Sequence, residues 1–253
     1  MSSNQSGNLP SALEHQKQIF ERLAKKRPII CLDYDGTLTP IVDDPSQAVL
    51  STKIKQLLQQ LAEYWTVVIL TGRALDDIKK LVGLKKLVYA GSHGFNIVGP
   101  NESFHEEPEK EFLPEIDQAE KELDTAISNL KRVQLERKRY AIAIHYRRAE
   151  DSILPELEKH VDSVAEKFPK LKKTTGKKIF ELRPNTDWHK GKALLYLLEK
   201  LHIDGSRILP LYIGDDTTDE DAFRAISDRG IGILVSDEDK ETAAHYAVQN
   251  TDE

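Results

Sequence analysis

A short apolar run that ends abruptly in two aspartates constrains the fold more than any other stretch of the sequence. Residues 29–32 read Ile-Ile-Cys-Leu and lead directly into Asp33-Tyr34-Asp35-Gly36-Thr37. An apolar run of strand length that ends in a polar turn is typical of a buried β-strand. The chain must therefore adopt a fold in which a buried strand delivers carboxylates to the edge of a sheet.

Two further segments repeat this arrangement of an apolar strand with a polar end. Residues 66–70 are followed by Thr71-Gly72-Arg73, and residues 208–213 are followed by the acidic run 214–221. Segments with helical periodicity lie between the expected strands, and the order strand, helix, strand predicts a parallel α/β sheet. Ligands of such sheets bind outside the carboxyl ends of the strands, so we expect the three polar ends to form one site.

The middle of the chain departs from this alternation. The sequence predicts a Rossmann-like α/β core formed by residues 1–98 and 187–253, interrupted by an inserted α+β segment at residues 99–186. In the core we expect helices over 12–26, 51–64, 74–82 and 190–201 and a strand over 86–90. In the insertion we expect helices over 114–131 and 152–168 and strands over 140–147 and 177–183.

Composition excludes several classes of protein. The chain has 42 acidic and 36 basic residues, and the basic ones are interspersed with acidic ones, which argues against nucleic-acid binding. No run approaches the roughly 20 apolar residues that span a bilayer, and the first ten residues lack the features of a secretory signal. Cys31 is the single cysteine, so no internal disulfide can form. We therefore expect a cytoplasmic protein that does not bind membranes.

The residue types at the strand ends favour phosphate chemistry with a metal ion. Carboxylates brought together repel one another unless a cation lies among them, and an oxygen-rich site with open positions suits Mg²⁺. A nearby lysine, such as Lys190, could neutralise a phosphate, and an aspartate can attack phosphorus as a nucleophile.

Each motif also has a simpler interpretation. Asp33 and Asp35 could be turn residues, Thr71-Gly72-Arg73 and the acidic run could cap helices, and Lys190 could be a solvated surface residue. A calcium-binding EF-hand loop is disfavoured, because Thr37 and Leu38 stand where that loop requires Asp or Asn and then Gly. The combination of motifs, more than any one of them, supports the chemical interpretation.

In combination the motifs resemble those of haloacid dehalogenase-like phosphatases. Asp33-Tyr34-Asp35-Gly36-Thr37, Thr71-Gly72-Arg73, Lys190 and Gly214-Asp215-Asp216 stand in the order of that superfamily's four motifs. Longer phrases resemble the trehalose-6-phosphate phosphatases within it, namely residues 32–41, 89–94, 180–184 and 214–221. The likeness extends from about residue 27 to about residue 235, and the first 26 residues lie outside it.

The resemblance implies a role for each motif residue. Asp33 would be the nucleophile, and Asp35 would protonate the departing sugar oxygen and then deprotonate the attacking water. Thr71 and Lys190 would hold the phosphoryl oxygens. Mg²⁺ would be bound by Asp33, by the backbone carbonyl of Asp35 and by Asp215, with Asp216 and Asp219 in support.

The resemblance also assigns the insertion to a cap that contacts the sugar. Trehalose presents only hydroxyl groups, so its recognition needs polar side chains that make directed hydrogen bonds. The substrate-binding residues that it implies are Gly72, Arg73, His93, Asn96, Glu136, Arg147, Lys177 and Glu181. Those in the insertion could equally be solvated surface residues, since Glu136 lies in a run of charges and Lys177 lies beside another lysine.

The sequence thus predicts Mg²⁺-dependent hydrolysis of trehalose 6-phosphate through an aspartyl-phosphate intermediate. One alternative is the same chemistry on a related sugar phosphate, derived from glucosylglycerol, mannosylglycerate or sucrose. The other is a catalytically silent regulatory module of a trehalose-phosphate synthase. We expect a monomer, and a trehalose-phosphate synthase is the protein partner that the resemblance suggests.

Overall fold

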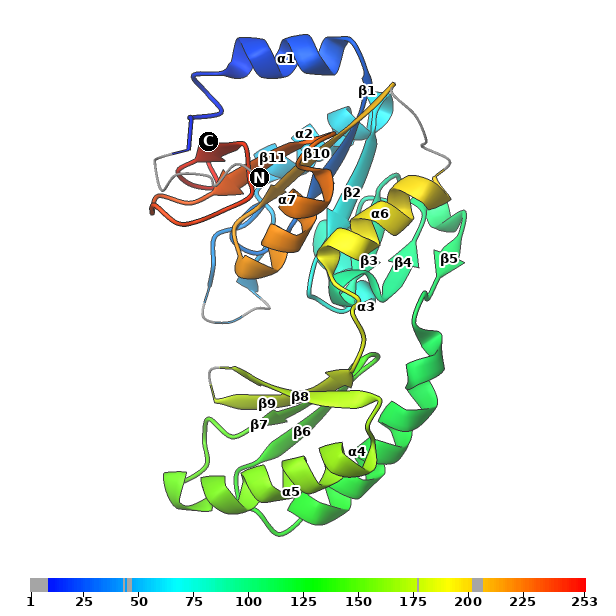
Figure 1. Cartoon of the computed structure of the whole chain (residues 1–253), viewed down its shortest axis with the longest axis vertical. Helices are drawn as coiled ribbons and strands as arrows, with labels where there is room; N and C mark the ends of the chain where they lie inside the picture. The colour runs from blue at the N-terminus through cyan, green and yellow to red at the C-terminus, as the bar shows by residue number, and fades with distance from the viewer. Residues whose placement is uncertain (1–8, 43, 45–46, 177, 202–206) are drawn as a thin grey trace. The chain divides into compact units, whose positions relative to one another are not determined.

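A computed structural model describes residues 9–42, 44, 47–176, 178–201 and 207–253 (Figure 1). The chain divides into two compact units. The first contains Met1–Glu107 and Trp188–Glu253, and the second contains Pro108–Asp187. The second unit is therefore inserted into the first along the sequence. It begins at residue 108 where the sequence placed the boundary at 99.

The first unit is built around an eight-stranded sheet with the order β12-β11-β10-β1-β2-β3-β4-β5. Six neighbouring strands are parallel: β12 (Tyr246–Val248), β11 (Ile231–Val235), β10 (Ile208–Gly214), β1 (Arg27–Leu32), β2 (Thr66–Leu70) and β3 (Val88–Gly91). The strands β4 (Asn96–Val98) and β5 (His105–Glu106) add an antiparallel edge. The α/β fold class predicted from the sequence is confirmed.

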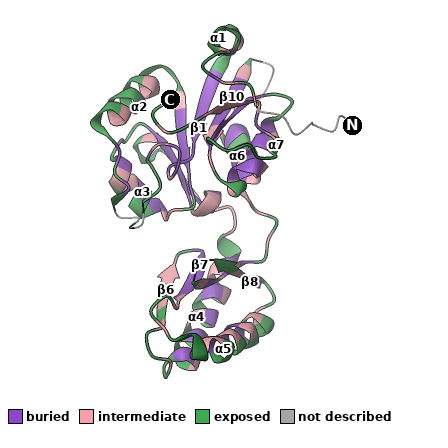
Figure 2. Ribbon diagram, turned by 90° about the vertical axis from the view of Figure 1, so that its left-hand side faces the viewer, coloured by how far each residue is buried: buried purple, intermediate pink, exposed green. Residues whose placement is uncertain are grey.

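Helices cover both faces of this sheet. The first unit contains α1 (Gln16–Ala24), α2 (Thr52–Tyr64), α3 (Leu75–Val82), α6 (Lys190–Lys200) and α7 (Glu220–Ile226). Ile30 and Leu32 of β1 belong to a cluster that includes residues of α1, α2 and α3, whereas Ile29 and Cys31 belong to one that includes residues of α6 and α7. Side chains alternate between the faces of a strand, so β1 is apolar from Pro28 to Leu32 because both of its faces are covered there (Figure 2).

The second unit contains a four-stranded antiparallel sheet with helices on one side. Its strands follow the order β6-β7-β9-β8, with bounds Gln134–Lys138, Ala141–His145, Ile179–Pro184 and Leu171–Gly176. The helices α4 (Leu113–Ile127) and α5 (Leu154–Lys167) lie on the same side of this sheet (Figure 1). They pack on it through a cluster that contains Ile142, Ile144, Phe180 and Leu182.

Several element predictions were wrong. Strands β4, β5, β6, β8, β11 and β12 were not predicted. Residues 99–107 continue the first unit, where β5 pairs with β4, which is why the insertion begins later than expected. The strand expected to begin at 177 is β9, which begins at Ile179. Among the described residues, no helix has the length and apolarity that crossing a membrane requires.

Candidate active site

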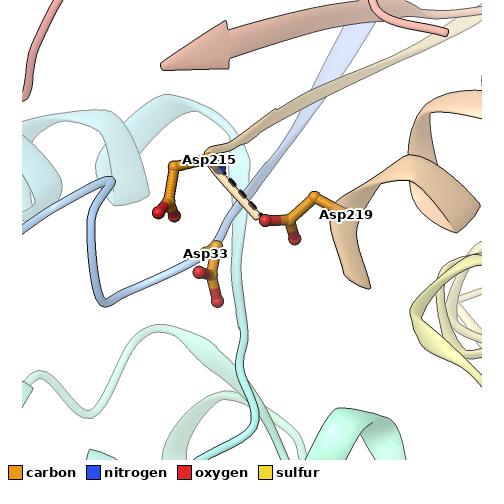
Figure 3. Close-up of side chains that lie close together, drawn as sticks. All are labelled: Asp33, Asp215 and Asp219. Carbon is orange, nitrogen blue, oxygen red and sulfur yellow. Dashed lines mark hydrogen bonds between the residues drawn. The ribbon is translucent and has the colours of Figure 1, made fainter. Parts of the chain in front are cut away.

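Three aspartates meet at the carboxyl ends of β1 and β10. Asp33, Asp215 and Asp219 each offer a carboxylate oxygen, and these oxygens lie within 4.8 Å of one another (Figure 3). Asp33 directly follows β1, and its backbone N–H donates to the carbonyl of Ile213 in β10 at 2.9 Å. Because β1 and β10 are parallel neighbours in the sheet, their polar ends lie side by side.

Lys190 joins this cluster at the first residue of α6. Its Nζ lies 2.9 Å from Oδ1 of Asp33 and 2.7 Å from Oδ1 of Asp219. The side chain of Lys190 is only 2 % exposed, so the alternative of a solvated surface lysine is wrong. A buried lysine requires compensating negative charge, and these two aspartates supply it.

Asp219 is fully occupied by hydrogen bonds from its own surroundings. Besides Lys190, the Tyr212 hydroxyl donates to its Oδ1 at 2.6 Å. The backbone N–H groups of Asp215 and Asp216 donate to its Oδ2 at 3.1 and 3.0 Å. Asp219 therefore fixes the turn that carries Asp215.

Asp216 lies on the exposed side of the same turn. Its Oδ1 accepts a hydrogen bond from the backbone N–H of Thr217 at 2.5 Å, which caps the short helix Thr217–Asp219. Capping is thus the role that the structure shows for Asp216.

The glycine after the two aspartates of the first motif makes room for Asp215. Gly36 has φ +79°, and a Cβ at this position would lie 2.0 Å from Oδ2 of Asp215. The hydroxyl of Thr37 donates to Oδ1 of Asp215 at 3.2 Å. The Asp-x-Asp-Gly-Thr sequence therefore positions a carboxylate from a distant part of the chain as well as its own.

The cluster carries more negative charge than Lys190 offsets. Burial raises the pKa of Asp33 to about 7, with Lys190 opposing this rise and the charge of Asp219 adding to it. Burial and the charge of Asp219 likewise raise the pKa of Asp215 to about 6. Burial alone would lower the pKa of Lys190, but the charges of Asp33 and Asp219 outweigh it and raise that pKa. A further cation at this site would relieve the repulsion between the carboxylates.

Asp35 and Arg73 form a two-point ion pair beside this cluster. Nε of Arg73 donates to Oδ2 of Asp35 at 2.6 Å, and its Nη2 donates to Oδ1 at 2.5 Å. The guanidinium also lies 5.3 Å from the centre of the Tyr34 ring, which is completely buried. Arg73, which the sequence placed among the substrate contacts, thus holds a carboxylate of the first motif.

The Thr71-Gly72 turn and His93 lie against each other at the ends of β2 and β3. The backbone N–H of His93 donates to the carbonyl of Thr71 at 2.8 Å, and a Cβ on Gly72 would lie 2.8 Å from Cε1 of His93. Asn96 is buried, and its Oδ1 is 2.6 Å from Nε2 of His105. These four predicted residues therefore belong to the first unit.

The second unit brings together only part of the predicted sugar site. Glu136 and Glu181 lie in one row of its sheet, on either side of Ala143. Arg147 lies in an exposed turn beyond the end of β7, so its predicted place on a strand is wrong. Lys177 lies outside the described residues.

Lys138 is a residue of this unit that the sequence argument missed. Its Nζ donates to Oε1 of Glu181 at 2.9 Å, while Oε2 of Glu136 lies 2.7 Å from Nε2 of His145. Glu136 and Lys138 are two positions apart and so point to the same face of β6. The sequence contains this alternation, but residues 136–139 are all charged, so the alternation does not stand out as that of a strand.

Comparison with known proteins decides the family. Residues 31–252 match the family described as trehalose-phosphatase. The chain belongs to the trehalose-phosphatase family. Its relatives include Probable trehalose-phosphate phosphatase I of Arabidopsis thaliana, which is 41 % identical over 257 residues that cover 96 % of this chain and 70 % of the relative.

Solved structures agree with the trehalose-phosphatase assignment. The trehalose-6-phosphate phosphatase of Aspergillus fumigatus has a TM-score of 0.68 and 26 % identity, over 97 % of this chain and 95 % of that one. A haloacid dehalogenase-like hydrolase from Bacteroides thetaiotaomicron shares the fold, with a TM-score of 0.64 and 16 % identity over 90 % and 96 % of the two chains. The predicted resemblance to trehalose-6-phosphate phosphatases is confirmed, and the fold is one that a haloacid dehalogenase-like hydrolase shares.

Proposed function

We propose that this protein hydrolyses trehalose 6-phosphate to trehalose and phosphate, with Asp33 as the nucleophile and Mg²⁺ as the cofactor. The observation that carries the proposal is the buried cluster of Asp33, Lys190, Asp215 and Asp219 at the end of the parallel strands. A regulatory module without catalysis would not need a buried lysine between two buried carboxylates, because such groups are costly to bury. The choice of trehalose 6-phosphate as the substrate follows from the relatives, which are named trehalose-phosphate phosphatases.

In this mechanism an oxygen of Asp33 attacks phosphorus and displaces the sugar oxygen. The bond from phosphorus to that oxygen breaks, and Asp35 supplies the proton that the departing hydroxyl requires. Asp35 then takes a proton from the water that attacks the aspartyl phosphate, which releases phosphate and restores Asp33. Arg73 orients Asp35 through both of its carboxylate oxygens.

Lys190 and Thr71 bind the phosphoryl oxygens in this proposal. Lys190 already lies 2.9 Å from Asp33, so an oxygen of a phosphoryl group on Asp33 would be within reach of the same ammonium. Thr71 is buried at the end of β2, which neighbours β1 in the sheet. Both residues would stabilise the charge that shifts onto the phosphoryl oxygens during transfer.

The residues of the cluster fit a magnesium ion. Asp33 and Asp215 offer carboxylate oxygens and Asp35 offers a backbone carbonyl, which are hard donors of the kind that Mg²⁺ prefers. Asp219 already accepts hydrogen bonds on both oxygens, so we assign it a supporting role. When bound, Mg²⁺ would offset phosphate charge and align the group for attack.

We also propose that the second unit is a cap that recognises the sugar. Glu136, Lys138 and Glu181 are polar side chains on one face of its sheet, and sugar hydroxyls bind to such groups. His93, Asn96 and Gly72 would contribute from the first unit. The proposed contacts of Arg147 and Lys177 rest on the family resemblance alone.

A panel of sugar phosphates tests the proposal. Phosphate release is measured from trehalose 6-phosphate, sucrose 6-phosphate, glucosylglycerol phosphate and mannosylglycerate phosphate, each with Mg²⁺ and with a chelator. We expect trehalose 6-phosphate to be hydrolysed fastest, and only with Mg²⁺. Asp33→Asn should abolish release from every substrate, whereas Asp228→Asn, a change at an exposed aspartate, should not. Preference for another sugar would overturn the substrate assignment, and no release from any substrate would support the silent regulatory module.

A further inference from the structure

The sheet of the second unit has one face that neither of its helices covers. The side chains of Ile142, Ile144, Phe180 and Leu182 point toward α4 and α5. The residues between them point the other way, because neighbouring residues of a strand alternate between faces. We call this second face the open face.

Strand pairing arranges the open face in rows. One row contains Glu136, Ala143, Glu181 and Thr174. Lys138 pairs with Ala141 in the next row, and Lys172 pairs with Arg183. Strands β7 and β9 are antiparallel and Ile142 pairs with Leu182, so the next pair along the two strands is Ala141 with Arg183. The second row therefore carries three cations and one alanine, and it contains no acidic residue.

Arg183 differs from the other charged residues of these rows because its guanidinium has no partner among the residues that the structure describes. Lys138 is paired with Glu181, Glu136 lies against His145, and Nζ of Lys172 donates to the carbonyl of Thr186 at 3.1 Å. Within the described part of the chain, no hydrogen bond or ion pair is formed by the Arg183 guanidinium, and its Nε is buried without an acceptor.

A buried donor without an acceptor is unfavourable, so its presence in a folded protein calls for an explanation. Guanidinium presents a planar set of donors that matches two oxygens of a phosphate. Ala141 on the facing strand has no polar side-chain atom that could accept a hydrogen bond from the guanidinium. The cations in the same row favour an anionic ligand over a neutral one.

We propose that Arg183 is the centre of an anion subsite on the open face, which binds the phosphate-bearing end of the sugar phosphate. This inference rests on the proposed function, and it adds an anion contact to the hydroxyl contacts proposed for Glu136 and Glu181. Arg183 lies near the end of β9, seven residues before Lys190 in the sequence. Lys172 and Lys138 add positive charge on either side.

Ligand binding to the full chain tests the subsite without turnover. In the Asp33→Asn background, affinities for trehalose 6-phosphate, trehalose and inorganic phosphate are measured by calorimetry, with and without Arg183→Gln. We expect Arg183→Gln to weaken trehalose 6-phosphate and inorganic phosphate by about tenfold or more and to leave trehalose unchanged. The affinity for trehalose 6-phosphate should also become less sensitive to salt.

Two further variants separate the subsite from general effects. Arg183→Lys keeps the charge and should retain most of the salt dependence. Lys159→Gln removes a charge from the exposed surface of α5 and should change none of the affinities. Thermal unfolding of each variant checks that it is folded.

Several results would overturn the inference. Equal losses for trehalose and trehalose 6-phosphate would show that Arg183 serves hydroxyl groups or the fold, and unchanged phosphate affinity would show that it binds no anion. A failure of the proposed function is recognised separately, because the unmodified protein would then release no phosphate from trehalose 6-phosphate. The inorganic phosphate measurement would still decide whether Arg183 forms an anion subsite.

Discussion

Asp33→Asn is expected to stabilise the metal-free protein at alkaline pH even as it removes the proposed nucleophile. The side chain of Asp33 is 7 % exposed, and its pKa is raised from 3.8 to about 7, first by burial and then by Asp219. At about 1.4 kcal/mol for each tenfold change in proton affinity, this difference corresponds to about 4 kcal/mol. Asparagine resembles the protonated aspartate in shape and charge, so it avoids this cost.

The sign follows from the raised pKa. A carboxyl whose pKa is higher in the folded state binds protons more tightly there, so its stabilising effect is complete below pH 4 and is lost as the pH rises through 7. The unmodified protein should therefore lose stability relative to Asp33→Asn between pH 4 and pH 8. The difference should reach at most about 4 kcal/mol.

Urea unfolding in the presence of a chelator, at several values between pH 5 and pH 8, measures this difference. Asp228→Asn is the matched control, since that aspartate is exposed, and we expect no comparable pH-dependent difference for it. Adding Mg²⁺ at pH 8 should raise the unfolding temperature of the unmodified protein more than that of Asp33→Asn. A difference that does not change with pH, or an unmodified protein that is the more stable at pH 8, would refute the electrostatic reasoning.

Three further variants test other parts of the site. Gly36→Ala should weaken Mg²⁺ binding by at least about tenfold, because its Cβ would collide with Asp215. Gly83→Ala, the control, is also at positive φ and should affect stability alone. Equal Mg²⁺ affinities of the two variants in a titration would contradict this. Tyr212→Phe should lower the free energy of unfolding by about 1–3 kcal/mol, since it removes the hydroxyl that donates to Asp219, and an unchanged urea midpoint would show that this bond contributes nothing. Glu181→Ala should slow trehalose 6-phosphate hydrolysis roughly ten- to hundredfold and leave a small aryl phosphate nearly unaffected; equal losses would place Glu181 in catalysis or folding.

The core of the site could be predicted from sequence because it lies at strand ends. Once residues 29–32 and 208–213 were interpreted as parallel strands, the meeting of Asp33 and Asp215 followed from sheet geometry. The burial of Lys190 between Asp33 and Asp219 did not follow. It depends on α6 packing beside α7, which no local pattern specifies.

The second unit was harder to predict for a physical reason. Its strands β6 and β8 carry long charged side chains at many positions, so they lack the clear apolar alternation that identifies a half-buried strand. Lys138 was missed for this reason. The ion pair of Asp35 with Arg73 joins residues 38 positions apart, and sequence gives no signal for such a pairing beyond the charges themselves.

Trapping the phosphorylated enzyme tests the central claim that Asp33 carries the phosphoryl group. The protein is mixed with excess trehalose 6-phosphate and Mg²⁺, quenched during turnover and treated with borohydride, which reduces an acyl phosphate to an alcohol. Peptide mass spectrometry then locates the change. The account predicts reduction at Asp33 alone, and none when Mg²⁺ or the substrate is omitted. Rapid phosphate release with an unmodified Asp33, or with the label on another residue, would contradict it.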